Sequence, residues 1–285
     1  MALEATESHR CFGGTLTWYR HNAATTGCPM RFTAFVPPQA AAEARPVLWW
    51  LSGLTCTADN FTSKAGAYRK AAELGLVIVA PDTSPRGETV PDDPEGAYDF
   101  GLGAGFYLDA KREPWALHYR MASYVTSELP QAVFAELPAD RSRQGLFGHS
   151  MGGHGALTLG LKNPGTYRSL SAFAPICAPS QVPWGEKAFA GYLGDDRGEW
   201  SRHDATALMR AAGDRSGFPP ILIDQGTADG FLDEQLRPHL FDAACGDAGQ
   251  ALTLRLQEGY DHSYFFISSF IDDHLEHHAA ILRQA

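Results

Sequence analysis

The sequence predicts an α/β fold in which a mostly parallel central sheet is flanked by helices on both faces. Segments typical of strands alternate with segments typical of helices along the 285-residue chain, which is the pattern of βαβ units. Several strand candidates, including 47–51 and 76–80, are apolar at nearly every position, as in strands that are buried on both faces. Because no linker or change in composition divides the chain, we expect a single domain over residues 1–285.

The strands and helices follow one another in a regular order. We expect strands at 31–36, 47–51, 75–80, 144–149, 169–174, 221–225 and 252–257. We expect helices at 63–74, 121–134, 152–161, 231–244 and 264–282. A polar N-terminal region precedes the first strand, which favours an antiparallel edge there. The stretch 81–113 is rich in Pro, Gly and Asp and is interpreted as a long functional loop.

Composition narrows the classes of partner and compartment. The chain has 33 acidic and 23 basic residues, and this excess argues against nucleic acid or an anionic membrane as a partner. There is no apolar run of ~18 residues that would span a bilayer, and the polar N-terminus does not resemble a signal peptide. The five cysteines are scattered without disulfide or zinc spacing. We therefore expect a cytoplasmic protein without a metal or other cofactor.

A candidate nucleophile lies in the motif G-x-S-x-G, Gly148-His149-Ser150-Met151-Gly152. An apolar strand candidate precedes the motif and a helix candidate follows it. This order is typical of a tight strand-to-helix turn that holds a serine hydroxyl exposed at the edge of the sheet. The alternative is that Ser150 only caps the helix. The surrounding order favours the catalytic interpretation.

A serine nucleophile needs a base and an acid, and the α/β-hydrolase fold supplies them in the order serine, acid, histidine. Asp229 follows the strand candidate 221–225 and is the favoured acid. Asp224 is expected to lie within that strand and Asp233 in the next helix. His262 lies between the last strand and the final helix, so it is the expected general base. A histidine with only a local hydrogen bond is the alternative.

The other histidines have simpler interpretations. His149 and His154 flank the nucleophile and are expected to pack or to bond locally. His274, His277 and His278 fall on the last helix, where His274 and His278 have the i,i+4 spacing of metal ligands. Neighbouring acidic residues favour a solvated helix face over a metal site.

The loop after an early strand can stabilise the negative charge that develops on a substrate oxygen. In this fold one backbone donor comes from the residue after the nucleophile and a second from such a loop. The expected donors are the N–H groups of Met151 and Leu54. Gly53 would let the backbone approach the substrate closely. The alternative is an ordinary turn between a strand and a helix.

The chain resembles the esterase D family of the α/β-hydrolase superfamily, whose members hydrolyse S-formylglutathione. The resemblance runs from about Cys11 to the final helix. It rests on several long strings: Trp50-Leu51-Ser52-Gly53-Leu54-Thr55-Cys56-Thr57, Ala80-Pro81-Asp82-Thr83-Ser84-Pro85-Arg86-Gly87, Gly103-Ala104-Gly105-Phe106-Tyr107, Gly148-His149-Ser150-Met151-Gly152-Gly153-His154-Gly155 and Leu256-Gln257-Glu258-Gly259-Tyr260-Asp261-His262-Ser263-Tyr264.

The resemblance implies a serine thioesterase that converts S-formylglutathione to formate and glutathione through a formyl-enzyme, with side activity on short acyl esters. It assigns the nucleophile, acid and base to Ser150, Asp229 and His262, and it supports Leu54 and Met151 as oxyanion donors. The reaction would remove formaldehyde that has been captured by glutathione. The resemblance also implies a cytoplasmic homodimer.

Two further residues are candidates for the substrate pocket. A formyl group is small, so the acyl pocket should be shallow, and Trp184 is either a wall of it or a core tryptophan. Cys56 lies two residues after the expected oxyanion donor Leu54. It is either a thiol that forms a mixed disulfide with glutathione or a small buried side chain.

Two alternative functions remain open on the same fold. An acyltransferase would pass the acyl group to an alcohol instead of water, and a non-catalytic binding protein would have kept the fold alone. The net charge of −10 also constrains the leading hypothesis. Glutathione conjugates are anionic, so their capture has to depend on local groups in the cleft.

Overall fold

The computed structural model describes residues 2–283 and contains a nine-stranded sheet with the order β1-β2-β3-β5-β4-β6-β7-β8-β9. Strands β1 to β3 are antiparallel to their neighbours, and β5, β4 and β6 to β9 are parallel to one another. The strands are β1 Glu4–Cys11, β2 Gly14–Ala23, β3 Cys28–Val36, β4 Arg45–Leu51, β5 Val77–Pro81, β6 Ala139–His149, β7 Tyr167–Phe173, β8 Ile221–Gly226 and β9 Leu252–Gln257.

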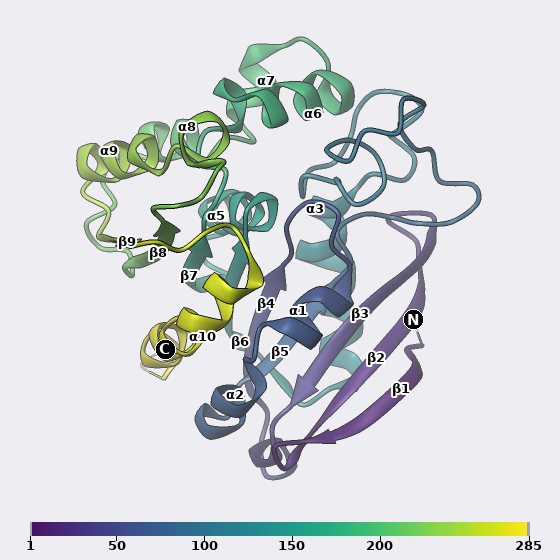
Figure 1. Ribbon diagram of the computed structural model, residues 1–285. Coiled ribbons are helices and arrows are strands. Elements are labelled where there is room, and N and C mark those ends of the chain that lie inside the picture. The colour runs from purple at the N-terminus through teal and green to yellow at the C-terminus, as the bar shows by residue number, and fades with distance from the viewer. Residues whose placement is uncertain (1, 284–285) are drawn as a thin grey trace.

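Helices cover both faces of this sheet (Figure 1). In Figure 1 the helices α1, α2 and α10 lie in front of the sheet, and α5 lies behind it. The α-helices are α1 Ala58–Lys64, α2 Tyr68–Leu74, α3 Met121–Ser123, α4 Leu129–Glu136, α5 Met151–Lys162, α6 Pro183–Leu193, α7 Arg197–Ser201, α8 Ala205–Ala211, α9 Pro238–Ala248 and α10 Tyr264–Leu282. Short 3₁₀ or π turns occupy η1 Pro38–Ala41, η2 Tyr124–Glu128, η3 Pro179–Gln181 and η4 Leu232–Leu236.

The observed sheet confirms the expected α/β class and the antiparallel edge. All seven expected strands are present with ends shifted by a few residues, and β1 and β2 extend the edge beyond them. The sequence did not reveal β1 because its side chains are almost all exposed, so it lacks the apolar alternation of a half-buried strand. The structure therefore has a long three-stranded antiparallel edge where the sequence predicted one short strand.

The observed helices differ from the ranges expected from the sequence where turns interrupt them. The expected helix 63–74 is two helices, α1 and α2, separated at Gly66, which has a φ of +72°. The expected helix 231–244 is a short π turn followed by α9, with Arg237 left-handed at the junction. Helices α6, α7 and α8 were not expected. They fill the connection between β7 and β8 and lie at the upper edge of the molecule in Figure 1.

The histidines of α10 contradict the expectation of a solvated helix face. His274 and His278 are fully buried against the sheet. His274 lies with its two ring nitrogens 2.8 Å from Ser171 Oγ and 3.1 Å from Asp224 Oδ2. His278 lies 2.9 Å from Ser171 Oγ and 2.7 Å from Ser169 Oγ. Serines on β7 supply the polar partners that let these imidazoles stay in the core.

The parallel strands place their carboxyl ends at one edge of the sheet. The loops after β4, β6, β8 and β9 all begin there, and they carry residues 52–57, Ser150, Asp229 and His262. In open α/β sheets, this edge is where ligands bind. Within residues 2–283, no helix combines the length and apolar character needed to cross a membrane.

Candidate active site

Ser150 occupies the tight turn between β6 and α5. Its backbone has φ 58° and ψ −118°, a conformation that L-residues rarely adopt outside constrained sites. The turn depends on a glycine two residues later, because a Cβ on Gly152 would lie 1.9 Å from the carbonyl oxygen of Leu51. The N–H of Ser150 donates to Phe173 O at 3.0 Å, which ties the turn to the end of β7.

Asp229 and His262 lie together beside this turn. The His262 ring nitrogen Nδ1 is 2.6 Å from Asp229 Oδ2. The other carboxylate oxygen, Oδ1, accepts from the N–H of Phe231 at 2.9 Å, and Gln225 Nε2 donates to Oδ2 at 3.2 Å. Asp229 is buried, so these bonds fix the carboxylate and, through it, the orientation of the His262 ring.

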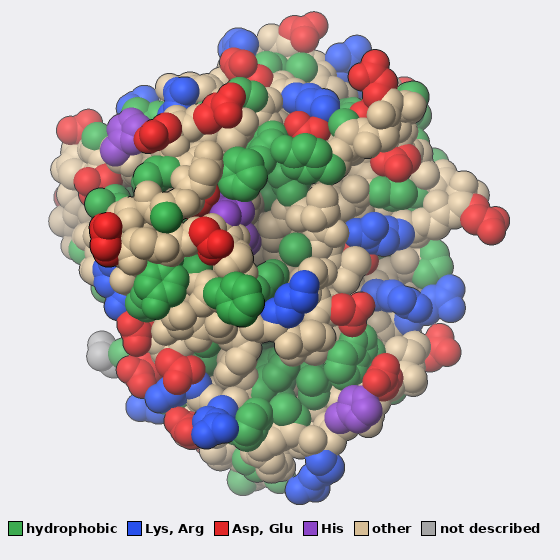
Figure 2. All heavy atoms as spheres, in the orientation of Figure 1, with side chains coloured by type: hydrophobic (Ala, Val, Ile, Leu, Met, Phe, Trp, Pro, Cys, Tyr) green, Lys and Arg blue, Asp and Glu red, His purple; other side chains and the backbone are tan. Residues whose placement is uncertain are grey.

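Ser150 and His262 line the same cavity, which has a volume of about 300 Å³. No hydrogen bond between the Ser150 hydroxyl and the His262 ring is recorded among the described residues. In enzymes without bound substrate such a bond is often long and shortens when substrate binds. Figure 2 shows histidine side chains inside a hollow near the centre of the face.

The loop after β4 forms the wall next to Ser150. A Cβ placed on Gly53 would lie 3.1 Å from the Ser150 Cβ, so this glycine permits the close approach. Thr55 is left-handed with a φ of 66°, and its N–H donates to Gly103 O at 2.9 Å. In the part of the chain that is described, the N–H groups of Leu54 and Met151 donate to no backbone oxygen. Both are therefore available to a bound oxygen atom.

Aromatic side chains close the cavity opposite this loop. Trp184 donates from Nε1 to the Tyr98 hydroxyl at 3.0 Å and packs 4.7 Å from the ring of Phe231. The Phe231 ring lies 5.1 Å from His262 in an edge-on arrangement. All three aromatic residues line the cavity with Ser150. These rings make this part of the lining apolar.

Cys56 lines the same cavity and is partly buried. Burial raises the pKa of its thiol, with smaller effects from its neighbours. A raised pKa lowers the fraction of thiolate at neutral pH and with it the reactivity of the group. Cys56 thus lines the same cavity as Ser150, as a thiol with low thiolate character.

His149 is a site residue whose position the sequence did not specify beyond local packing. Its ring centroid lies 4.3 Å from that of His262, and its Nε2 is buried with no hydrogen-bond partner among the described residues. Burial, and then the nearby His262, hold the pKa of His149 well below its usual value. His149 is therefore a neutral packing partner of the His262 ring. His154 Nε2–H donates to Phe106 O at 3.1 Å, as expected for a locally bonded histidine.

The two competing acids are placed elsewhere. Asp224 lies within β8 and is held by Arg255, with Arg255 Nε 2.7 Å from Oδ1. Burial alone would raise the pKa of Asp224, but hydrogen bonds from His274 and Arg255 outweigh it and lower the pKa to about 2. Asp233 lies in the η4 turn and is exposed. Among the described residues, the carboxylate that His262 pairs with is that of Asp229.

The sequence analysis did not identify three residues that line the cavity with Ser150, namely Tyr98, Phe231 and Tyr264. Tyr98 belongs to the loop 81–113 that was interpreted as functional, and it meets Trp184 from a segment 86 residues away. Phe231 and Tyr264 each lie two residues after a predicted site residue, Asp229 and His262. That proximity along the chain was the available signal for these two.

Comparisons with known proteins find related sequences that match nearly the whole chain. Residues 23–277 match a family model described as a putative esterase. Two curated relatives carry the name S-formylglutathione hydrolase. The one from Mus musculus is 54% identical over 284 residues and covers 99% of both chains. The one from Paracoccus denitrificans is 53% identical over 280 residues and covers 98% of both chains.

Solved structures of related proteins have the same fold. An S-formylglutathione hydrolase from Agrobacterium tumefaciens superimposes with a TM-score of 0.95 and is 52% identical, covering 99% of this chain and 100% of that one. A Staphylococcus aureus serine hydrolase superimposes with a TM-score of 0.73 at 16% identity, over 93% of this chain and 98% of that one. This more distant likeness shows the shared fold alone.

Proposed function

The chain belongs to the S-formylglutathione hydrolases of the esterase family, and from this membership and the site we propose that it hydrolyses S-formylglutathione to formate and glutathione. The proposal includes a Ser150–His262–Asp229 triad and a formyl-enzyme intermediate. The observation that carries it is the arrangement at one cavity of a strained Ser150, a His262–Asp229 pair at 2.6 Å and two N–H groups free of backbone acceptors. The proposed biological role of this reaction is the removal of formaldehyde that glutathione has captured.

In the acylation step, Ser150 Oγ attacks the formyl carbon of the thioester. His262 Nε2 takes the hydroxyl proton, since its Nδ1 faces Asp229. The buried carboxylate stabilises the imidazolium that forms and keeps the ring in the correct tautomer. The Oγ–C bond forms as the carbonyl π electrons move to oxygen.

The carbonyl oxygen gains negative charge in this step. The N–H groups of Met151 and Leu54 are the proposed donors to it, because they flank Ser150 and donate to no described backbone oxygen. Met151 begins α5, so the helix dipole adds to the stabilisation. Loss of one such donor typically costs about 10²–10³ in rate.

Collapse of the intermediate breaks the C–S bond and leaves formyl-Ser150. Glutathione departs with the proton that His262 took from Ser150, which leaves the imidazole neutral again. Since a thiol pKa is about 8.5, the sulfur needs little acid assistance to leave. Water then attacks the formyl group while His262 accepts its proton. Formate leaves and Ser150 recovers its hydrogen.

A substrate panel tests the proposed reaction. The purified protein is assayed with S-formylglutathione, acylglutathiones of increasing chain length and short nitrophenyl esters. We expect kcat/KM to be highest for S-formylglutathione and to fall as the acyl chain grows against the wall of Trp184 and Phe231. Short esters should be turned over more slowly. Equal or better turnover of long acyl chains would contradict the proposed substrate, and transfer of the acyl group to an added alcohol in place of formate release would indicate an acyltransferase.

A further inference from the structure

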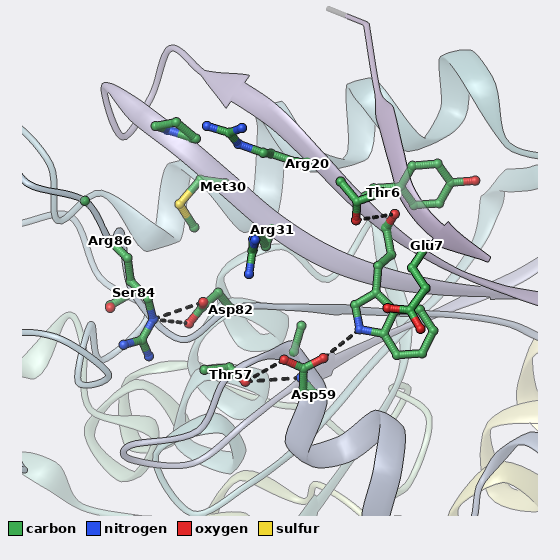
Figure 3. A pocket seen from close by; sticks show the side chains of 15 residues that line it. Thr6, Glu7, Arg20, Met30, Arg31, Thr57, Asp59, Asp82, Ser84 and Arg86 are labelled. Carbon is green, nitrogen blue, oxygen red and sulfur yellow. Dashed lines mark hydrogen bonds and ion pairs between the residues drawn. The ribbon is translucent and has the colours of Figure 1, made fainter. Parts of the chain in front are cut away.

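A second and larger cavity lies on the other side of the loop after β4. Its volume is about 780 Å³, and it lies between strands β2 and β3, the start of α1 and the loop that follows β5. Three arginines line it, Arg20, Arg31 and Arg86, together with three acidic and several apolar residues. Figure 3 shows the Arg31 side chain pointing from β3 into the middle of this cavity. The proposed reaction does not use any of these side chains.

Arg20 and Arg31 form an unusual pair within the cavity. They stand directly opposite each other on the antiparallel strands β2 and β3, so their side chains leave the same face of the sheet. Like charges in directly opposite positions destabilise a strand pair. Within residues 2–283, neither guanidinium has a carboxylate within ion-pair distance, although Glu4 stands opposite Arg20 on β1. An anionic ligand would relieve this repulsion.

The acids that line the cavity are already engaged by other groups. Asp82 receives Arg86 Nε on both oxygens, at 3.1 and 3.0 Å. Asp59 accepts from Trp18 Nε1 at 2.6 Å. Glu7 pairs with His9 at 2.6 Å on the outer surface. The two free positive charges of Arg20 and Arg31 are thus left for a ligand.

The cavity shares a wall with the active site. Residues 53–56 line the cavity that holds Ser150, and residues 57–59, which continue the same segment, line the second cavity. Arg86 fastens this wall, because its Nη2 donates to the Cys56 carbonyl oxygen at 3.2 Å. Consecutive residues of one segment therefore face the two cavities.

The distance between the two cavities suits a short peptide. Ser150 follows β6, and Arg31 lies on β3 three strand positions away, next to the carboxyl end of β5, where the Asp82 N–H donates to Arg31 O at 3.1 Å. Three strand spacings correspond to about 14 Å between backbones. From its sulfur to either terminal carboxylate, extended glutathione spans about 7–10 Å. The long arginine side chain covers the remaining distance.

We propose that Arg31 and Arg20 bind a terminal carboxylate of the peptide arm of the thioester substrate while its acyl group lies at Ser150. This inference rests on the proposed function and extends it to the part of the substrate that does not react. A guanidinium pair is well suited to a carboxylate, since each presents paired N–H donors. It also gives an acidic protein a local means of holding an anionic substrate.

The double variant R20Q/R31Q tests the inference against two substrates with the same reacting group. S-Formylglutathione carries the carboxylates, and S-formyl-N-acetylcysteamine is a thioester without them. We expect kcat/KM for S-formylglutathione to fall at least about tenfold, mainly through a higher KM, because a charge-assisted bond is lost. For the neutral thioester, kcat/KM should stay within about twofold of the wild-type value.

Arg168→Gln is the matched control, because Arg168 is exposed near the amino end of β7, at the opposite edge of the sheet. It should leave both substrates unaffected. Equal losses on the two thioesters, or no loss on either, would overturn the carboxylate site while leaving the proposed function in place. A wild-type protein that turns over the neutral thioester but not S-formylglutathione would overturn the proposed function and this inference together.

Discussion

At the scale of single residues, the site depends on a few side chains that are held in one geometry by buried neighbours. Asp229 is the clearest case, because one oxygen faces His262 and the other is fixed by the Phe231 N–H. We therefore expect that a substitution of Asp229 that keeps the shape of the side chain but removes its charge will lower the catalytic rate more than the stability of the fold.

The variant Asp229→Asn should lower kcat by about 10³–10⁴, because an amide no longer selects the tautomer of His262 or stabilises its charged form. Asp233→Asn is the matched control, since Asp233 is exposed in the η4 turn and the ion pair of His262 is with Asp229. Steady-state kinetics with S-formylglutathione measure both. A loss below tenfold for Asp229→Asn, or a similar loss for the control, would remove Asp229 from its proposed role.

The sequence was informative about these residues to different degrees. Ser150, Asp229 and His262 could be chosen because each follows a recognisable strand, and the order of strands sets which loops meet. The residues that form the cavity wall could not be predicted in this way. Tyr98 and Trp184 meet across 86 positions, and such a contact depends on a loop path that no local pattern specifies.

At the scale of elements, the site is supported by contacts on the far side of its strands. Asp224 on β8, Ser171 on β7 and His274 on α10 form one buried hydrogen-bonded chain. The strand β8 leads to Asp229, and α10 begins two residues after His262. This chain therefore couples the two elements that carry the proposed acid and base.

Replacing His274 with Leu should destabilise the protein by about 2–4 kcal/mol, because the buried Asp224 and Ser171 each lose a partner. His239→Leu is the control, since His239 on α9 is exposed and should change stability by less than about 0.5 kcal/mol. Urea unfolding followed by fluorescence gives both values. If His274→Leu were as stable as the control, the buried chain would not support the fold.

The elements also show why the sequence predicted helix α10 correctly but its histidines wrongly. Histidines spaced beside Asp and Glu are typical of a solvated face, and only the positions of Ser169 and Ser171 on β7 make burial tolerable. Those serines alternate with apolar residues in a strand whose sequence is typical of a buried strand. Their role as partners becomes visible only when α10 is placed against the sheet.

At the scale of the whole molecule, buried neutral histidines connect stability to pH. Burial lowers the pKa of seven of them, to about 4 for His203 and His277 and to about 3 for His154; the others are His21, His149, His274 and His278. The unfolded chain takes up their protons near pH 6.5. Between the folded and unfolded values only the unfolded state is protonated, so stability rises with pH and is lost as pH falls below 6.5.

The melting temperature should therefore fall steadily from pH 7 to pH 5, with up to about 1.4 kcal/mol lost per pH unit for each such histidine. Calorimetry at pH 5.5 in two buffers of different ionisation enthalpy should show uptake of several protons on unfolding. A melting temperature that stays constant over this range, or unfolding without proton uptake, would show that these histidines are protonated in the folded protein.

The net charge of −10 has a consequence at the same scale. Long-range attraction does not gather an anionic thioester, and the Arg20–Arg31 pair provides the positive charge locally. The sequence indicated the need for local groups, but the strand register that brings these two arginines together came from the structure. The expected homodimer stays a prediction, because the sequence pattern indicates no interface.

The central claim is that Ser150 is the nucleophile of a thioesterase that acts on S-formylglutathione. The most direct measurement compares wild type with Ser150→Ala in formate release from this substrate, alongside their melting temperatures. The account predicts that turnover by Ser150→Ala falls to background while the melting temperature stays close to that of wild type, because the substitution removes one hydroxyl group. Near-wild-type formate release by a folded Ser150→Ala protein would contradict it.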